Sequence, residues 1–329
     1  MKAIKILTMA ALATAVFASC SSEDELAQNN YPMDNVVRIM TSVDGMNTRA
    51  SYGNSTDKLN SFGFCIKNAN SETYTYDNVK VTKEGSNWNP ATQMLWQNST
   101  TAVDILAYAP YQETTEDANG KVNVFGKTDY AFSVKEDQSN AEDYSSDLIV
   151  YKKTGFKPES DLNTNQAVDV TFTHLLSQLN LTIELRDQFN QDEKKPVTSA
   201  TVTDVKVDGT FIRSKVNFAA DPISVLRDGH ASTAITPETV AFKKADKTTD
   251  HATFKYSAIV IPQKVIVGQL CIKFKVDGTD YIWTGTSDVE FVSGKKYDLL
   301  LLVGKDVVQG GTISATPWGD GGTGSLETD

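Results

Sequence analysis

Apolar and polar residues alternate with a period of two along most of the chain. From residue 37 to residue 43, one face collects Val37, Ile39, Thr41 and Val43. A strand presents successive side chains to opposite faces, so this alternation predicts a half-buried strand. Residues 271–276 repeat the pattern, and the turn signal Asp277-Gly278 separates them from a second apolar run at 281–283. That arrangement predicts a β-hairpin.

Turn signals recur between these runs, whereas helical patterns are rare. Further glycine-containing turns are expected at 84–87, 119–120, 208–209 and 293–294. The leucine-rich segment 177–185 is apolar at every second position, so a strand is the better interpretation there. Short strands at this spacing, with no regular helices between them, predict an all-β fold of mainly antiparallel sheets packed as sandwiches.

The length of the chain predicts more than one domain. At about 100–200 residues per domain, 329 residues suggest two. The stretch 155–166 contains a proline, an aspartate and two asparagines and is typical of a connector. We therefore expect an N-terminal sandwich over 36–165 and a C-terminal sandwich over 166–329. A signal peptide over 1–19 and an acidic linker over 20–35 precede them.

The N-terminus carries an export signal. Lys2 and Lys5 precede an uncharged, mostly apolar run at 6–18, and Ser19 and Cys20 follow it. A basic start, a short apolar run and small residues at the cut site are typical of a secretory signal. The run is shorter than the roughly 20 residues that a membrane span needs.

Cys20 stands at the predicted cleavage point. The junction resembles a bacterial lipobox, in which cleavage leaves an N-terminal cysteine that is then acylated. An ordinary cleavage site with a chance cysteine is the alternative. Glu23, Asp24 and Glu25 follow shortly afterwards, as in the acidic export tag of surface lipoproteins, although acidic runs of this kind also occur as solvated linkers.

Composition narrows the range of partners. The chain holds 31 basic and 42 acidic residues, a net charge of −11, and loss of Lys2 and Lys5 with the signal makes the mature chain −13. Such a surface repels phosphate backbones, so nucleic acid is excluded as a partner. The two other cysteines, Cys65 and Cys271, lie in apolar runs and are expected to be buried free thiols.

No catalytic or metal-binding pattern stands out. His174, His230 and His251 share no ligand spacing, and His174 is expected to be a satisfied core or interface histidine. No nucleophile or phosphate-loop motif is present, so we expect neither an enzyme nor a cofactor. The tryptophans, Trp88, Trp96, Trp283 and Trp318, are expected in the core, with stacking on sugars as the alternative.

An ordered set of segments resembles the fimbrillins of Bacteroidales, which are lipoprotein precursors of pilus subunits. The resemblance implies two transthyretin-like β-sandwich domains, a surface-exposed lipoprotein of the outer membrane, and incorporation into a fimbria. The segments run through nearly the whole chain: the lipobox at Cys20, the strand at 36–43, Thr48-Arg49-Ala50, 62–64, 104–111, 146–150, 172–179, 261–263 and 294–297.

The resemblance also implies a mode of assembly. In fimbrillins an arginine-specific protease cuts behind the first strand and releases it, and the C-terminal strand of another subunit fills the vacated groove. Here the cut would fall between Arg49 and Ala50, and the released strand would carry Val37, Ile39 and Val43. The alternative for Arg49 is an ordinary solvated loop residue.

The C-terminus supplies a candidate donor strand of limited length. Residues 312–316 alternate, so Ile313, Ala315 and Trp318 are the candidate donor residues, but the polar tail at 319–329 has four glycines and a single leucine. An accessory, tip or anchor subunit therefore stays open beside a stalk subunit. The expected function is that of a structural and adhesive pilus subunit, with other subunits and a host protein or glycan receptor as partners. A monomeric, glycan-binding surface lipoprotein of a nutrient-uptake system is the alternative.

Overall fold

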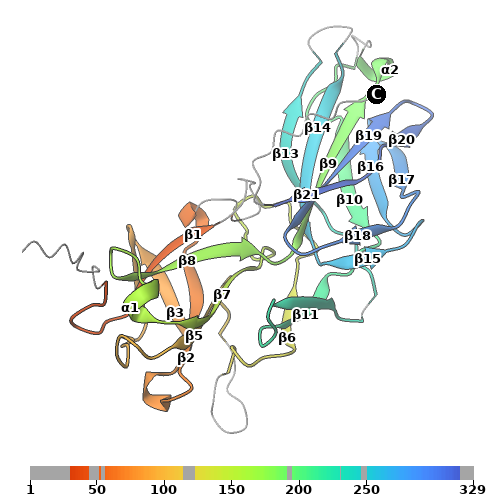
Figure 1. The fold of residues 1–329 in the computed structure, drawn as a ribbon. Coiled ribbons are helices and arrows are strands. Elements are labelled where there is room, and N and C mark those ends of the chain that lie inside the picture. Colours follow the sequence, from red (N-terminus) through yellow and green to blue (C-terminus); the bar gives the residue numbers. More distant parts are fainter. Residues whose placement is uncertain are drawn as a thin grey trace, which may run out of the picture.

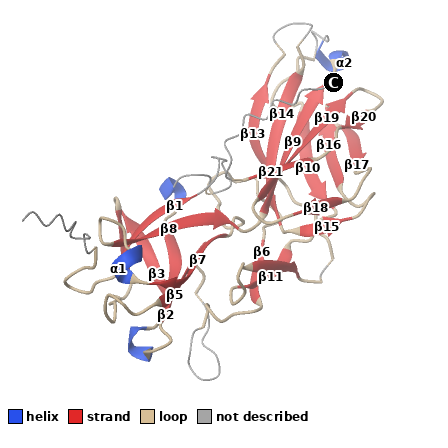
Figure 2. Ribbon diagram, viewed as in Figure 1, coloured by secondary structure: helices blue, strands red, loops and turns tan. Residues whose placement is uncertain are grey.

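The computed structural model describes residues 30–43, 52, 56–113, 123–190, 195–229, 231–245 and 250–318. Strands make up 51% of the structure and helices 5%. The sequence-based prediction of an all-β fold is therefore confirmed, and Figure 2 shows strands throughout both lobes of the molecule. In these ranges, no helix has the length and apolar character needed to cross a membrane.

A single seven-stranded sheet forms the first lobe (Figure 1). Its order is β1-β8-β7-β5-β2-β3-β4, and all neighbours are antiparallel except β1 and β8, which are parallel. The strands are β1 (Arg38–Val43), β2 (Ser61–Lys67), β3 (Tyr76–Glu84), β4 (Asn87–Pro90), β5 (Val103–Ala109), β7 (Ile149–Phe156) and β8 (Ala167–His174).

The centre of this sheet is buried on both faces. Along β5, Ile105 and Ala107 pack into the core of the first lobe, while Leu106 and Tyr108 pack into the core that continues toward the second lobe. Strand β2 is divided in the same way, because Phe64 faces the first core and Cys65 the second. A strand that is buried on both faces has apolar residues at nearly every position, as the segment 103–109 has.

The second lobe is a sandwich of two main sheets. One has the order β13-β14-β9-β19-β20, with β21 also paired to β19, and the other has the order β10-β16-β17. Strands β9 and β19 are parallel. The bounds are β9 (Ser177–Leu185), β10 (Val202–Asp208), β13 (Glu238–Lys243), β14 (Ala252–Val260), β16 (Cys271–Val276), β17 (Thr279–Thr284), β19 (Lys295–Val303), β20 (Val308–Gly310) and β21 (Ser314–Pro317).

Smaller elements complete the fold. A three-stranded sheet, β12-β11-β6, lies beside the first lobe and below the second in Figure 1, and β15 pairs with β18. Their bounds are β6 (Tyr130–Ser133), β11 (Arg213–Asn217), β12 (Ser224–Arg227), β15 (Gln263–Val265) and β18 (Val289–Phe291). The helices are single turns: η1 (Thr56–Lys58), η2 (Glu72–Tyr74), α1 (Pro158–Asp161) and α2 (Asp187–Asn190).

Two sequence predictions hold in detail. Strands β16 and β17 form the expected hairpin, with Val276 opposite Thr279 across the turn. Strand β9 is extended, as its alternation indicated. The imperfect alternation of β10 also has a structural cause, because its register shifts between Thr203 and Lys206 and Asp204 adopts a φ of 53°. A β-bulge inserts an extra residue and so displaces the period-two pattern.

The chain changes lobes later than its composition suggests. The stretch 155–166 contains α1 and leads back into the first sheet, where β8 pairs with both β1 and β7. The passage to the second lobe follows His174, at the end of β8. In the opposite direction, β6 precedes residue 165 but pairs with β11. The seven-stranded sheet therefore extends beyond the expected 36–165 domain by one strand, because β8 completes it.

Candidate functional site at the first and last strands

The first strand buries one face in the core of the first lobe. Val37, Ile39 and Val43 are 3%, 8% and 6% exposed, whereas Met40 on the opposite face is 43% exposed. The alternation in the sequence thus corresponds to a real division between core and solvent. Fully burying an aliphatic side chain of this size is worth about 1.5–3 kcal/mol, so β1 contributes substantially to the stability of this lobe.

Strand β1 lies at the edge of its sheet. Among the described strands it pairs along its length with β8 alone, from Arg38 opposite Ala167 to Val43 opposite Phe172. On its other side, backbone contacts with the rest of the lobe are confined to the residues just before β1. Val36 forms an isolated bridge with Leu95, and the N–H of Trp96 donates to the carbonyl oxygen of Asn35 at 2.8 Å.

A groove of about 1070 Å³ runs along this open side of β1. It separates β1 from β4, so the two edge strands of one sheet face each other across it. Both apolar and polar side chains line the groove, among them Val37, Ile39, Met40, Asn87, Trp88, Pro90 and Met94. Unpaired sheet edges are templates for another strand, so this is the part of the first lobe best suited to receive one.

A short ion-paired segment precedes β1. Arg38 donates to both carboxylate oxygens of Asp34, at 3.1 and 2.6 Å. The hydrogen bond from Arg38 is the main cause that lowers the pKa of Asp34 below its ordinary value. Both side chains are solvent-exposed, so the pair orients the chain entering β1 more than it stabilises the fold.

The predicted cleavage site, Arg49 and Ala50, lies outside the described residues, as does the predicted lipidation site, Cys20. Tyr52, close behind the cleavage site, is described and buried. Its N–H donates to Oδ2 of Asp147 at 2.9 Å, and its ring lies 5.6 Å from that of Tyr144. The chain behind the predicted cleavage site is therefore anchored in the core.

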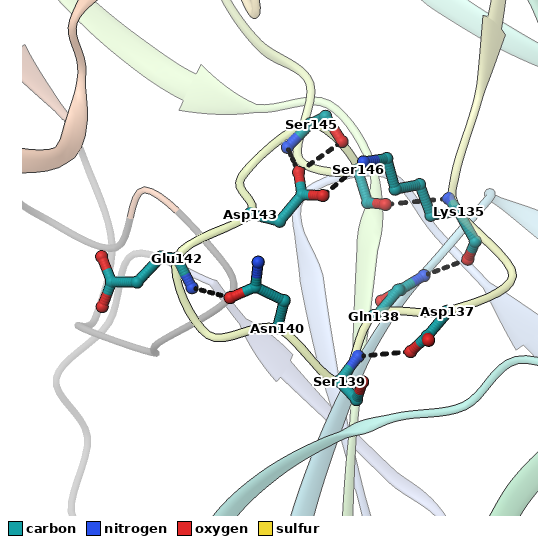
Figure 3. A network of polar contacts seen from close by, with 9 residues as sticks. All are labelled: Lys135, Asp137, Gln138, Ser139, Asn140, Glu142, Asp143, Ser145 and Ser146. Carbon is teal, nitrogen blue, oxygen red and sulfur yellow. Dashed lines mark hydrogen bonds and ion pairs between the residues drawn. The ribbon is translucent and has the colours of Figure 1, made fainter.

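A tightly bonded turn region leads to Asp147 (Figure 3). Asp143 accepts hydrogen bonds from the backbone N–H and the hydroxyl of Ser145 and forms an ion pair with Lys135. The N–H of Lys135 donates to the hydroxyl of Ser146 at 2.8 Å. The side-chain amide of Gln138 pairs with both backbone groups of Ile259 in the second lobe. These bonds hold the approach to Asp147 in one conformation.

The candidate donor strand is already paired within its own lobe. Strand β21 runs antiparallel to β19, with Ala315 opposite Tyr297. Ala315 is exposed, Ile313 is partly buried and Trp318 is 1% exposed. The candidate donor residues therefore have different surroundings in the precursor, and Trp318 is the one held in the core. The polar tail at 319–329 lies outside the described residues.

The remaining candidate residues have structural surroundings. His174 is buried and contacts Asp147, while His251 lies between Glu184 and Asp187, at the opposite end of β9. His230 is outside the described residues. Within the described part of the chain, no three His, Cys, Asp or Glu side chains are grouped to hold a metal ion.

The cysteines differ from each other more than the sequence suggested. Cys65 is buried and Cys271 is partly exposed, and both are free thiols. Burial raises the pKa of Cys65 well above its ordinary value, with the neighbouring carboxylate of Asp77 as a further cause. The Cys65 thiol therefore stays protonated, and it donates to Oδ1 of Asp77 at 3.2 Å.

Three of the four tryptophans are buried. Trp96 stacks on Phe156 at 5.6 Å between ring centroids, and Trp283 and Trp318 belong to the core of the second lobe. Trp88 is half-buried in β4, where its ring lies 5.0 Å from that of Phe62. Among the four tryptophans, Trp88 in the groove is therefore the one whose ring is accessible for stacking on a sugar.

Comparison with known proteins agrees with this architecture. The model of the fimbrillin-like family matches residues 48–318. A fimbrial protein from Bacteroides vulgatus is similar in structure, with a TM-score of 0.52 and 17% identity over 86% of this chain and 99% of that one. A candidate cell adhesion protein from Bacteroides ovatus reaches a TM-score of 0.60 at 12% identity, covering 86% and 97% of the two chains.

A candidate cell adhesion protein from Bacteroides uniformis is similar as well, with a TM-score of 0.52 and 19% identity over 87% of this chain and 99% of that one. At these identities the likeness shows the fold alone. No curated protein sequence matches the chain. The family model covers most of the chain, including the strands of both lobes from β2 to β21. The chain belongs to the fimbrillin-like family.

Proposed function

We propose that this chain is a structural and adhesive subunit of a cell-surface fimbria, with no enzymatic role. The observation that carries the proposal is the position of β1, an edge strand with a buried apolar face beside an open groove. Membership of the fimbrillin-like family and the fold shared with a fimbrial protein support the same function.

Assembly by strand exchange follows from the properties of β1. Cleavage between Arg49 and Ala50 would leave β1 held to the sheet without a covalent connection behind it. Its departure would expose the core that Val37, Ile39 and Val43 now cover, together with the backbone edge of β8. A groove with an apolar floor and an unpaired edge accepts an extended segment by β-augmentation. The C-terminal strand of a second copy, with Ile313, Ala315 and Trp318, is the proposed donor.

The proposed experiment treats the soluble precursor, without its signal peptide, with an arginine-specific protease and follows the formation of polymers. The precursor should lose residues before Ala50 and then form oligomers. Arg49→Lys is the matched control, since it keeps the positive charge but resists this protease, and it should stay monomeric. Polymers formed by the uncleaved Arg49→Lys protein would overturn protease-triggered assembly.

Export as a surface lipoprotein is the second part of the proposal. Cys20 would be acylated after removal of residues 1–19, and two or more acyl chains anchor a protein stably. Cells that express the protein with Cys20→Ala should incorporate no labelled fatty acid into it and should release it from the outer membrane. Cys20→Ser is a conservative control that should behave in the same way. Label retained by either variant would exclude this anchor.

One observation favours the glycan-binding alternative. The groove places the half-buried Trp88 among the side-chain amides of Asn87, Asn89 and Gln93. An aromatic face beside amide groups can bind a sugar. Titration of the uncleaved precursor with oligosaccharides distinguishes the two functions: binding that is lost in Trp88→Ala would favour the glycan-binding alternative, whereas absence of binding to the unchanged precursor would exclude it.

A further inference from the structure

Three side chains meet in the core where the two lobes join. Nδ1 of His174 lies 2.9 Å from Oδ1 of Asp147, and both side chains are buried. The histidine also contacts the residue that follows the C-terminal strand. Its ring stacks on the indole of Trp318, with ring centroids 4.0 Å apart and planes inclined by 2°. The end of β21 thus rests on a residue that belongs to β8 of the first lobe.

The same carboxylate holds the chain behind β1. Oδ1 of Asp147 contacts His174, while Oδ2 accepts the N–H of Tyr52. A buried carboxylate that is hydrogen-bonded through both oxygens fixes the positions of both partners. Tyr52 and Trp318, near opposite ends of the chain, are therefore connected through two intervening side chains.

Backbone contacts seat Trp318 independently of its ring. The N–H of Trp318 donates to the carbonyl oxygen of Gly294 at 2.9 Å, and the N–H of Gly294 donates to that of Leu176 at 2.8 Å. Gly294 has a φ of 68°, and a Cβ there would lie 3.3 Å from the carbonyl oxygen of His174. A glycine is thus required for the turn that receives Trp318.

The rest of the C-terminal strand is weakly held. All four residues of β21, Ser314–Pro317, are exposed. In the described structure the buried indole N–H of Trp318 has no hydrogen-bond acceptor, which opposes its burial. Apart from its backbone pairing with β19, the docked strand is thus held mainly by Trp318, directly after β21. The burial of Trp318 is itself less favourable than it would be if its indole N–H had an acceptor.

We propose that Asp147, His174 and Trp318 form a latch that keeps the C-terminal strand on its own lobe. When the latch opens, β21 becomes available to the groove of a second copy of this chain, and the edge of β19 from Lys295 to Asp298 is uncovered. Because Asp147 also binds Tyr52, the state of the chain behind β1 is coupled to the state of the C-terminal strand. The latch stands on its own contacts, whereas its link to processing rests on the proposed function.

Hydrogen–deuterium exchange on the uncleaved, monomeric precursor tests the latch. Trp318→Ala should raise the exchange rate of the amides at 314–318 by about tenfold or more, because local opening sets that rate. Trp318→Phe keeps an aromatic ring on His174 and should restore most of the protection. Thr316→Ala, in the same exposed strand, is the matched control and should leave the rate unchanged.

The coupling is tested at the other end of the same network. Trp318→Ala and His174→Ala should each raise the exchange rate of the Tyr52 amide, and the double variant should exchange no faster than the more affected single variant. Unchanged exchange at 314–318 in Trp318→Ala would overturn the latch. Unchanged exchange at Tyr52 in both single variants would overturn the coupling. These exchange measurements use the uncleaved monomer. Failure of the latch or of the coupling is therefore distinguishable from failure of protease-triggered assembly.

Discussion

The N–H of Val37 donates to the carbonyl oxygen of Met94 at 3.0 Å, joining the two opposite edges of the first sheet at one point. Val37 belongs to the chain entering β1, and Met94 to the chain leaving β4. Past this contact the two edges separate around the groove. The sheet is therefore closed at one end and open along Ile39 and Thr41.

This geometry predicts an alternating pattern of amide exchange along β1. Backbone groups of successive strand residues point in opposite directions, and the N–H of Val37 points toward the groove side. The amides of Ile39 and Thr41 point the same way and should exchange rapidly, whereas those of Met40 and Ser42 face β8 and should be protected. Exchange measured by NMR checks this. Equal protection at all four amides would mean that the groove is filled in solution.

The buried face of β1 should control the stability of the first lobe. Ile39→Ala removes a buried side chain at a sheet edge and should lower the free energy of unfolding by about 2–3 kcal/mol. Met40→Ala, at the adjacent exposed position, should change it by less than about 0.5 kcal/mol. Urea denaturation measures both. Equal effects of the two variants would show that β1 is not packed on the core in solution.

Gly310 should be required for the close packing of β20 on Trp283 of β17. A Cβ at this position would lie 2.0 Å from Nε1 of Trp283, so Gly310→Val forces β20 away from β17. Overpacking of this kind is expected to destabilise the fold by about 1–3 kcal/mol. Gly311→Ala is the matched control, because its nearest neighbour is the carbonyl oxygen of Leu300 at 3.8 Å. A lower melting temperature for Gly311→Ala than for Gly310→Val would contradict this packing.

Ionisation of Tyr256 should weaken the fold at high pH. Burial raises the pKa of this tyrosine from 10.0 to about 12. Because the folded-state pKa is the higher one, the stabilisation is complete below pH 10 and is lost as the pH rises from 10 toward 12. The loss at pH 11 is about 1.4 kcal/mol, at 1.36 kcal/mol per pKa unit. Tyr256→Phe should show a decline from pH 8 to pH 11 that is smaller by this amount in urea denaturation. An identical decline in both proteins would exclude the effect.

The sequence predicted those strands whose two faces differ in polarity. Ile272, Phe274 and Val276 alternate with lysines and proved to be the buried side of β16. Residues 103–109 lack such alternation, and the overlapping segment 104–111 was singled out only because it resembles a segment of the fimbrillins. These features are local, because each depends on neighbours within a few residues.

The sequence did not predict which distant segments pair with each other. The parallel pairing of β1 with β8 and of β9 with β19 depends on contacts that no local pattern encodes. The stretch 155–166 resembled a connector because proline and asparagine favour turns, but its turn returns the chain to the same sheet. Likewise, His174 was expected to be buried, but its stacking on Trp318 follows only from the way in which β8 and β21 converge.

Loss of β1 should be measurable and reversible by a peptide. Trypsin-like cleavage of the folded precursor should begin at Arg49, since nicking concentrates at exposed loops and most strand lysines are in paired segments. Release of β1 would uncover the core beneath Val37, Ile39 and Val43 and should lower the stability by several kcal/mol, at about 1.5–3 kcal/mol for each side chain. Differential scanning calorimetry of the precursor and the cleaved protein measures this.

A peptide copying residues 36–43 should raise the melting temperature of the cleaved protein, because a ligand that binds only the folded state stabilises it. A peptide copying residues 312–318 should do the same if the C-terminal strand is the donor. A version of the second peptide with Ile313 and Trp318 replaced by serine is the control and should have no effect. Cleaved protein that melts at the temperature of the precursor would exclude strand exchange. If the first peptide raises the melting temperature but the second does not, the groove vacated by β1 would still be an acceptor site. The donor strand would then have to come from a different subunit.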